Sequence, residues 1–371
     1  MGTPVAPLKL ALGEKVKDQF IVRKKLGEGS CGTVFLVQSL KESRIRAAMK
    51  VEPFMKNKDD EILKMEVFVL KKMQKSKHVC RLLMAGKMNN FSYLIMSLLG
   101  KELSDIRRRL PEKKMSAASG LKIGIQATQA IQDMHAAGFV HRDVKPTNFC
   151  VGAMHKCMVY IFDFGLARQI LVPDKDGNLK LREPRNKVSF RGTVRYCSVN
   201  VHEYKEQGRH DDLWSMLYML IELITGTLPW KGLARRESGQ IKAVVADCNL
   251  VGKCPASFGE LNQALKKLTY ADVPNYDVIK DTFKRDLKET KVKLMDPFEW
   301  DVIKEDKKSS AEKVTDNKEK DEKAEIDKMD NTDTYRDIDE SGPSGASDED
   351  SEGKGFAKED TLENVAEMNA K

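Results

Sequence analysis

The sequence predicts an α+β protein with a small antiparallel β-sheet and one helix, a larger and mostly helical part, and a disordered C-terminal tail. Short apolar runs of strand length come first, and longer segments with apolar residues at helical spacing follow. From residue 303 onward Lys, Glu, Asp and Ser dominate, with Tyr335 and Phe356 as the only aromatic residues. Such a segment buries too little apolar surface to offset the entropy of ordering, so we expect it to be disordered.

The small sheet and its helix come first, and the chain changes character near residue 96. The strand-like runs are residues 20–26, 33–37, 47–52 and 91–96. Residues 59–75 lie between the third and fourth runs and predict the single helix, because their apolar residues recur at helical spacing. These apolar residues are Ile62, Met65, Val69 and Met73.

Two long segments indicate the helical part. Residues 116–137 carry apolar residues at helical spacing, and residues 212–226 are apolar nearly all round, as in a helix at the centre of a lobe. No internal repeat is visible in the sequence. The expected bounds are 1–14 for an N-terminal extension, 15–302 for the folded domain, with lobes at 15–96 and 100–302, and 303–371 for the tail.

Charge is distributed unevenly along the chain, whose formal net charge is +8. Residues 301–371 hold 12 basic and 23 acidic side chains, which leaves a net charge of +19 on the first 300 residues. A segment of 300 residues with this much positive charge attracts anionic partners. Nucleic acid, a membrane surface, a nucleotide and acidic protein segments all qualify, and charge does not choose among them.

Cysteine spacing and hydropathy indicate an intracellular protein. The seven cysteines include no Cys-x-x-Cys pair, so we expect free thiols in a reducing compartment. No run reaches the roughly 18 to 20 apolar residues of a membrane span, and the N-terminus lacks the apolar core of a signal peptide. We therefore expect a cytoplasmic or nuclear location and no membrane association.

A glycine-rich loop joins the first two predicted strands. Its residues are Gly27, Glu28, Gly29, Ser30, Cys31 and Gly32. Glycines let backbone N–H groups approach a phosphate. A dinucleotide-binding turn would open a helix, whereas residues 33–37 are typical of a strand, so the loop would lie over bound phosphates as a lid. An ordinary tight hairpin is the alternative.

Lys50 lies on the next predicted strand, eighteen residues after Gly32. A nucleoside triphosphate needs a cation over its α- and β-phosphates, and a carboxylate must hold that cation in place. Glu66, on the predicted helix, is the candidate partner. The alternative for Lys50 is an ordinary solvated strand lysine.

The most specific pattern is His-Arg-Asp-Val-Lys-Pro-Thr-Asn over residues 141–148, followed by Asp-Phe-Gly over 163–165. Phosphoryl transfer needs a base that orients the acceptor hydroxyl, and oxygen ligands for magnesium. Asp143 supplies the base, and Lys145 neutralises charge on the moving phosphoryl group. Asn148 and Asp163 supply the metal ligands.

In this order, the glycine loop, the lysine and the two motifs resemble the protein kinase family over about residues 15–300. Lys145, two places after Asp143, is similar to the serine/threonine kinases. The usual Ala-Pro-Glu at the end of the activation segment is absent. Residues 198–202 read Ser-Val-Asn-Val-His instead, a signature that resembles the casein kinase 1 superfamily. Residues 190–196 and 63–67 are most similar to its tau-tubulin kinase branch.

The resemblance implies the bilobal protein kinase fold and the remaining nucleotide contacts. Val34 and Ala48 would roof the adenine, and Met96 would be the gatekeeper behind it. Leu99 would belong to the hinge, residues 97–99, whose backbone receives the adenine edge. The implied cofactors are ATP and Mg²⁺, with Mn²⁺ as the alternative metal.

Two further roles follow from the same resemblance. Asp212 would brace the backbone of the catalytic loop, residues 141–148. Thr193 would lie beside Asp143 and Lys145, near the acceptor hydroxyl.

The expected function is that of a non-specific serine/threonine protein kinase, which transfers the γ-phosphoryl group of Mg-ATP to Ser or Thr hydroxyls of proteins. The rival is a pseudokinase that acts as a binding scaffold, although the chain keeps Lys50, Asp143 and Asp163, which pseudokinases usually lose. A nucleic-acid-binding protein is a third possibility, but no recognition-helix or stacking-aromatic motif is visible, so we expect no nucleic acid partner. We expect a monomer.

The resemblance to casein kinase 1, whose members often favour acidic or phosphorylated stretches, implies an anion site for such protein substrates, built from basic residues of the activation segment and of the stretch after the buried helix. The candidates are Arg185, Arg195 and Arg236, with Lys187, Arg191, Arg235 and Lys242 nearby. Bidentate arginines suit phosphate recognition. Solvated surface charge is the alternative.

Two smaller hypotheses concern the tail and the glycine loop. Ser347 and Ser351 lie among acidic residues, so the tail could dock in the basic body as a pseudosubstrate or be phosphorylated there, and a solvated charge run is the alternative. Cys31 could be oxidised or alkylated to block nucleotide, or it could be an inert thiol.

Overall fold

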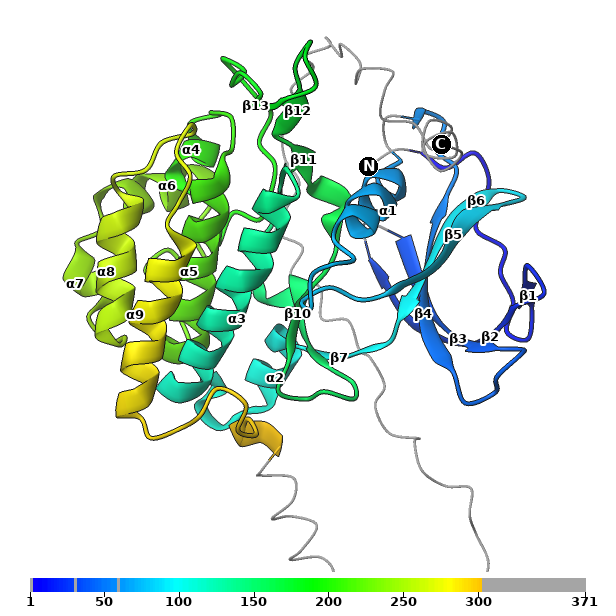
Figure 1. The fold of residues 1–371 in the computed structure, drawn as a ribbon, viewed down its shortest axis with the longest axis horizontal. Helices are drawn as coiled ribbons and strands as arrows, with labels where there is room; N and C mark the ends of the chain where they lie inside the picture. The colour runs from blue at the N-terminus through cyan, green and yellow to red at the C-terminus, as the bar shows by residue number, and fades with distance from the viewer. Residues whose placement is uncertain (1–2, 30–31, 59–60, 302–371) are drawn as a thin grey trace, which may run out of the picture.

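The structure of the protein is a computed structural model that describes residues 3–29, 32–58 and 61–301. It has a sheet-rich lobe and a helical lobe, joined near strand β7 (Leu99–Glu102) (Figure 1). This architecture confirms the predicted fold class. The predictions for Ser30, Cys31 and the tail fall on residues outside the described ranges.

The small lobe is built on an antiparallel sheet of six strands in the order β1-β2-β3-β4-β6-β5. The strands are β1 (Lys15–Val16), β2 (Phe20–Gly29), β3 (Gly32–Ser39), β4 (Arg46–Pro53), β5 (Leu82–Met88) and β6 (Phe91–Ser97). Side chains alternate across β4. Met49 and Val51 pack into the outer apolar cluster of the lobe, whereas Ala48 belongs to the cluster that continues into the helical lobe. The alternation therefore turns Ala48 and Lys50 toward the cleft between the lobes.

Helix α1 (Leu63–Lys72) is shorter at both ends than the predicted 59–75. Its start is fixed by Glu52 on β4, whose carboxylate accepts hydrogen bonds from the backbone N–H of Ile62 at 2.9 Å and of Leu63 at 3.1 Å. The first N–H groups of a helix have no partner within the helix, and a negative charge there is favourable. A residue distant in the sequence thus decides where the helix begins.

The helical lobe contains the two predicted long helices and a set of shorter elements. Its helices are α2 (Leu103–Arg109), α3 (Ala117–Ala136), α4 (Val199–His202), α5 (Arg209–Thr225), α6 (Arg235–Val244), α7 (Asp247–Val251), α8 (Ala256–Leu265) and α9 (Tyr276–Glu289). Its short strands are β7, β8 (Phe139–Val140), β9 (Phe149–Gly152), β10 (Val159–Ile161), β11 (Arg168–Gln169), β12 (Leu171–Pro173) and β13 (Leu179–Leu181). Helix α5 lies at the centre, between α3 and the outer helices (Figure 1).

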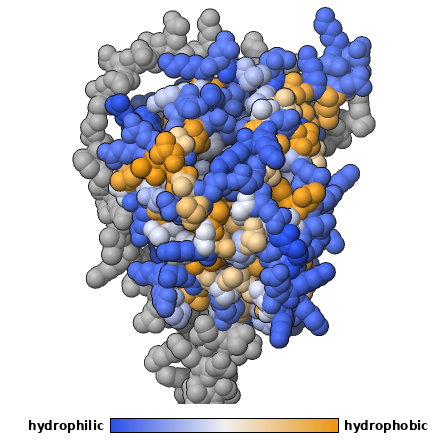
Figure 2. Space-filling model, turned by 90° about the vertical axis from the view of Figure 1, so that its left-hand side faces the viewer, coloured by the Kyte–Doolittle hydropathy of each residue, from blue (hydrophilic) through white to orange (hydrophobic). Residues whose placement is uncertain are grey.

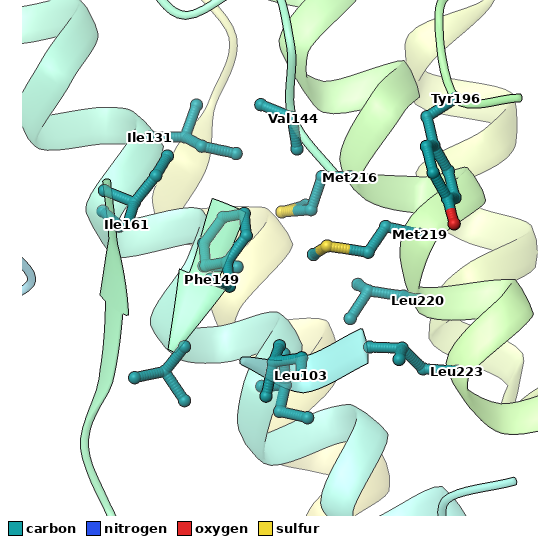
Figure 3. Packing of buried hydrophobic residues seen from close by; sticks show 14 of the residues in the cluster. Leu103, Ile131, Val144, Phe149, Ile161, Tyr196, Met216, Met219, Leu220 and Leu223 are labelled. Carbon is teal, nitrogen blue, oxygen red and sulfur yellow. The ribbon is translucent and has the colours of Figure 1, made fainter. Parts of the chain in front are cut away.

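The core of this lobe anchors the catalytic loop. Val144 in the loop and Phe149 just after it are almost fully buried. Figure 3 shows both pointing toward Met216 and Met219 of α5, with Ile131 of α3 beside them. Burying an apolar side chain of this size contributes about 1.5–3 kcal/mol, so the loop is held from below by the core.

The outer face of the helical lobe is mostly hydrophilic, with small separate apolar areas (Figure 2). Scattered exposed apolar residues are ordinary on protein surfaces. Among residues 3–29, 32–58 and 61–301, no helix combines the length and the apolar composition needed to cross a membrane.

Candidate active site

An ion network joins the two lobes at the back of the cleft. Lys50 Nζ on β4 lies 2.6 Å from Glu66 Oε2 on α1 and 2.9 Å from Asp163 Oδ1 in the segment after β10. Lys50 and Glu66 are buried, whereas the Asp163 side chain keeps 25% of its surface exposed. The sequence predicted the Lys50–Glu66 pair, and the structure adds Asp163 as a second partner.

Charge explains how this network remains ionised. Burial alone would lower the pKa of Lys50, but attraction by Glu66 and Asp163 outweighs it and raises that pKa far above its usual value. Burial would raise the pKa of Asp163, and Lys50 instead lowers it. Burial raises the pKa of Glu66 against the pull of Lys50. The 2.6 Å contact is typical of a charge-assisted bond, so we treat Lys50 and Glu66 as an ion pair.

The register of the sheet lines up the residues expected around adenine. Val34 on β3 pairs with Lys50, and Ala48 pairs with Met96 on β6. Ala48 and Met96 are buried, and Val34 packs partly buried against the same cluster. Leu99 opens β7 and pairs with Gly152 on β9. Val34, Ala48 and Met96 therefore lie close to Lys50 in the sheet, and Leu99 follows where the chain enters the helical lobe.

Gly29 at the end of β2 pairs with Gly32 at the start of β3, so the described glycines of the loop belong to two antiparallel strands. Gly32 has φ +115°, and a Cβ atom there would lie 2.3 Å from the carbonyl oxygen of Val51. Only glycine fits such a position. Around Gly27 and Gly29 there is open space, and Glu28 is exposed beside Lys25. The strand pairing thus confirms that the glycines join two strands, and the phosphate-binding role of the loop stays a prediction.

The catalytic loop presents the carboxylate of Asp143 with each oxygen held. Its Oδ1 accepts a hydrogen bond from the hydroxyl of Thr193 at 2.7 Å, and its Oδ2 lies 2.8 Å from Lys145 Nζ. Lys145 also donates to the Thr193 hydroxyl at 3.2 Å. Gly192, with φ +113°, permits this approach, because a Cβ atom there would lie 2.6 Å from the carbonyl oxygen of Arg142.

Asn148 and Asp163 fit the expected metal ligands. Asn148 donates from Nδ2 to the backbone carbonyl of Asp143 at 2.8 Å, which leaves its Oδ1 as an oxygen donor. Asp163 adopts a left-handed conformation with φ +63°, which is costly for a residue with a side chain and typical of functional sites. One carboxylate and one amide suit Mg²⁺, which usually takes its other ligands from water and substrate phosphates.

A buried network behind the loop fixes its backbone. Asp212 on α5 accepts hydrogen bonds from the N–H of His141 at 2.7 Å and of Arg142 at 2.8 Å. His135 Nε2 donates to the same carboxylate at 2.8 Å, and its Nδ1 accepts from the Tyr276 hydroxyl at 2.6 Å. Burial lowers the pKa of His135, so the ring is neutral and bridges α9 to the loop. Asp212 occupies the bracing position that the resemblance implied.

Comparison with known proteins decides the family. The model of the protein kinase domain matches residues 20–289. The chain belongs to the protein kinase domain family. Geometry and family thus agree on which cleft holds the chemistry.

Three relatives of this chain are informative. A probable serine/threonine-protein kinase of Dictyostelium discoideum is 37% identical over 79% of the chain, but the chain spans only 58% of that protein. A putative casein kinase I of Caenorhabditis elegans is 37% identical over 62% of the chain and 67% of its own length. An inactive tau-tubulin kinase of the same organism is 34% identical over 64% of the chain and 86% of its own length.

The arginines predicted as an anion site lie in different surroundings. Arg185 makes a bidentate contact with Glu206, at 2.5 and 3.1 Å, and Arg195 lies 3.3 Å from Glu222. Both glutamates are buried, so each compensates an arginine charge. Arg236 is exposed on α6.

Lys242, which the sequence placed among the surface basic groups, is in fact 5% exposed and donates to backbone carbonyls. This corrects the prediction, because α6 packs with that face inward. The partners Glu206 and Glu222 were not predicted from the sequence, and neither were His135 and Tyr276. Glu222 had a visible signal, since it is a charged residue inside the apolar helix α5.

Replacing Asp212 by Asn tests the brace. We expect the kinase domain to lose about 3 kcal/mol of unfolding free energy, because an amide N–H₂ would face a backbone N–H or His135 and leave a buried donor unpaired. Chemical denaturation checks this loss. Asp281→Asn, which changes an exposed acid of α9 that pairs with Lys284, is the control and should leave the midpoint almost unchanged. Equal stability of the two variants would contradict the bracing role.

Proposed function

We propose that this protein is a serine/threonine protein kinase that transfers the γ-phosphoryl group of ATP to Ser or Thr hydroxyls of protein substrates. The observation that carries the proposal is the intact site. Lys50 is held by Glu66 and Asp163, and Asp143 is held by Lys145 and Thr193 within the same cleft. Pseudokinases usually lack one of these charged residues, so the complete set supports an active enzyme.

Each residue has a chemical task in this proposal. Asp143 orients the acceptor hydroxyl and takes its proton, and Lys145 offsets negative charge on the phosphoryl group. Lys50, fixed by Glu66, holds the α- and β-phosphates. Asp163, together with Asn148, would hold divalent metal, which when bound neutralises phosphate charge; we propose Mg²⁺, with Mn²⁺ as the alternative. The left-handed backbone at Asp163 aims its carboxylate into the cleft.

Phosphate transfer from radiolabelled ATP to casein, tubulin and an arrayed peptide library tests the proposal. We expect incorporation into Ser and Thr that disappears when the divalent metal is removed with EDTA. The alternative is a pseudokinase, and one of the relatives is named an inactive tau-tubulin kinase. ATP binding by the intact chain without transfer to any acceptor would favour the pseudokinase and overturn the proposed activity.

We further propose that this kinase belongs to the casein kinase 1 superfamily, near its tau-tubulin kinase branch. The Ser-x-Asn-x-His signature of residues 198–202 supports this placement. In the structure these residues form a compact unit: Ser198 donates to Asp211 at 2.6 Å, and Asn200 lies 2.9 Å from His210. The names of two of the relatives point the same way.

The proposed substrates are acidic or phosphorylated protein segments. Support comes from the net charge of +19 on residues 1–300 and from three arginines in and near the activation segment. Because Arg185 and Arg195 are already paired with buried glutamates, Arg236 is the arginine most open to a substrate anion. We therefore expect it to contribute most of the added affinity.

A ranked peptide library measures this preference. We expect acidic and phosphorylated peptides to have kcat/KM values on the order of tenfold above neutral ones, an effect of one charge-assisted contact. Arg236→Ala should reduce the difference in kcat/KM between acidic and neutral peptides, because it should raise KM for the acidic peptides only. Equal rates on acidic, phosphorylated and basic peptides would contradict the proposed preference for anionic substrates.

A further inference from the structure

We propose that Lys242 is a positioning residue for protein substrates, because it holds the turn over residues 193–197 against the catalytic base. This inference rests on the proposed kinase function. It concerns a side chain on α6 that lies outside the cleft and that no motif of the sequence singles out.

The turn is a single helical turn with its later carbonyls turned toward the lobe. The N–H groups of Tyr196 and Cys197 both donate to the carbonyl of Thr193 at 3.0 Å. The last carbonyls of such a turn have no backbone partner and need another donor. Side chains provide it, because Trp230 Nε1 donates to the carbonyl of Arg195 at 2.7 Å.

Lys242 donates to two more carbonyls of the turn. Its Nζ donates to the carbonyl of Val194 at 2.6 Å and to that of Cys197 at 2.7 Å. An ammonium group has three donors, and the third faces His202 Nε2 at 3.3 Å. Burial and the positive charges of Lys242 and Arg235 lower the pKa of His202 to about 4, so the ring is neutral, and Nε2 accepts in the tautomer that carries its proton on Nδ1. The three donors of Lys242 therefore meet three acceptors.

Aromatic faces surround the buried cation. Lys242 Nζ lies 5.1 Å from the centre of the Trp230 ring and 5.5 Å from that of Tyr218, both within the range of cation–π attraction. Burial lowers the pKa of Lys242 to about 8, and the adjacent Cys197 thiol has its pKa raised by burial. Taking the charge of Lys242 out of water is costly, and an apolar side chain of similar volume would pack here without that cost.

The other side of the turn touches the catalytic base. Thr193, its first residue, donates to Asp143 and accepts from Lys145. Gly192 brings the backbone against Arg142. The turn is therefore fixed between Lys242 on one side and the catalytic loop on the other, where an acceptor hydroxyl must be placed.

Gly239 on α6 lets the helix come close enough for this contact. A Cβ atom at Gly239 would lie 2.8 Å from the His202 ring. Alanine there would displace the ring that accepts the third Lys242 hydrogen bond. Gly239→Ala is thus a second probe of the same arrangement, made without altering the lysine.

The test compares full-length variants at saturating ATP. Lys242→Met keeps the volume of the side chain and removes its donors. We expect kcat/KM for a peptide substrate to fall by on the order of 10²-fold, the effect of a misplacement of about 1 Å, while the Kd of ATP stays within about twofold. Gly239→Ala should give a smaller loss of the same kind, and Lys242→Arg, which restores donors, should recover part of it.

Lys280→Met is the matched control. Lys280 is a largely buried lysine of α9 that contacts Gln129, Gln132 and Asp277, far in the sequence from the turn. We expect it to change thermal stability but not kcat/KM for peptide. The proposal is overturned if kcat/KM of Lys242→Met stays within twofold of that of the intact chain. It is also overturned if the variant loses ATP affinity together with kcat/KM. If Lys242→Met fails to fold, unchanged peptide kinetics of Gly239→Ala overturn it instead.

Hydrogen exchange separates this inference from the kinase function itself. The amides of Tyr196 and Cys197 should exchange at least tenfold faster in Lys242→Met, or in Gly239→Ala, than in the intact chain, whether or not any phosphate is transferred. Unchanged exchange rates of these two amides would overturn the proposed role of Lys242 in holding the turn. Absence of transfer by the intact chain, with this exchange difference present, would overturn the proposed function alone.

Discussion

Asp143→Asn is expected to lower the rate of phosphoryl transfer by on the order of 10²–10⁴-fold, the usual contribution of a positioned base. Asparagine has nearly the same shape as aspartate, so its single oxygen can still accept from Lys145, while its amide N–H₂ faces the Thr193 hydroxyl and can donate to it. It cannot take the proton of the acceptor hydroxyl. Radiolabelled transfer to casein or to the best library peptide measures the effect, and ATP affinity should change little because Lys50 remains in place.

Asp277→Asn is the control for this variant. Asp277 is 76% exposed on α9, where it pairs with Lys280, so its loss should leave the rate unchanged. A rate for Asp143→Asn within tenfold of the intact chain would show that another group takes the proton. Loss of ATP binding in Asp143→Asn would instead show that the variant had damaged the cleft, and a role in orienting the acceptor would then need a different residue.

The cleft could be predicted from sequence because its chemistry fixes residue types. The proposed phosphoryl transfer would need charged groups at Lys50, Asp143 and Asp163, so motifs in the sequence pointed to them before the fold was known. The strand β5 was missed for the opposite reason. Its residues 82–88 include Gly86 and Lys87, and β-branched residues are absent. Gly86 is needed because a Cβ atom there would lie 2.8 Å from the Tyr93 hydroxyl, a contact visible only in the folded sheet.

The anion site illustrates what a linear pattern cannot contain. Arg185 and Arg195 look alike in the sequence, but their charges are offset by Glu206 and Glu222, which follow 21 and 27 residues later. Lys242 reads as one more basic residue and is buried. Each of these outcomes depends on which side chains the fold brings together. A prediction of charge along the chain therefore overestimates the charge that a substrate meets.

Lys50→Met should lower both the rate of phosphoryl transfer and the free energy of unfolding. Methionine keeps the volume but leaves Glu66 and Asp163 without the cation between them. Breaking one partner of a buried pair costs about 3 kcal/mol. Transfer should fall by at least about 10²-fold, because nothing then holds the phosphates in line. Denaturation and radiolabelled transfer measure the two effects, with Lys87→Met on the exposed face of β5 as the control that changes neither.

A double variant separates these two effects. Adding Glu66→Met to Lys50→Met replaces the buried pair by two apolar side chains of similar volume, and such replacements are often neutral or stabilising. We therefore expect stability to return toward that of the intact chain, while transfer stays as low as in the single variant. Recovery of transfer in the double variant would contradict the role of Lys50, since it would mean that the single variant had failed only because an unpaired glutamate disturbed the cleft. Persistent inactivity in a stable protein ties the loss to the missing cation itself, which is the distinction between a lysine that holds phosphates and one that only holds the lobes together.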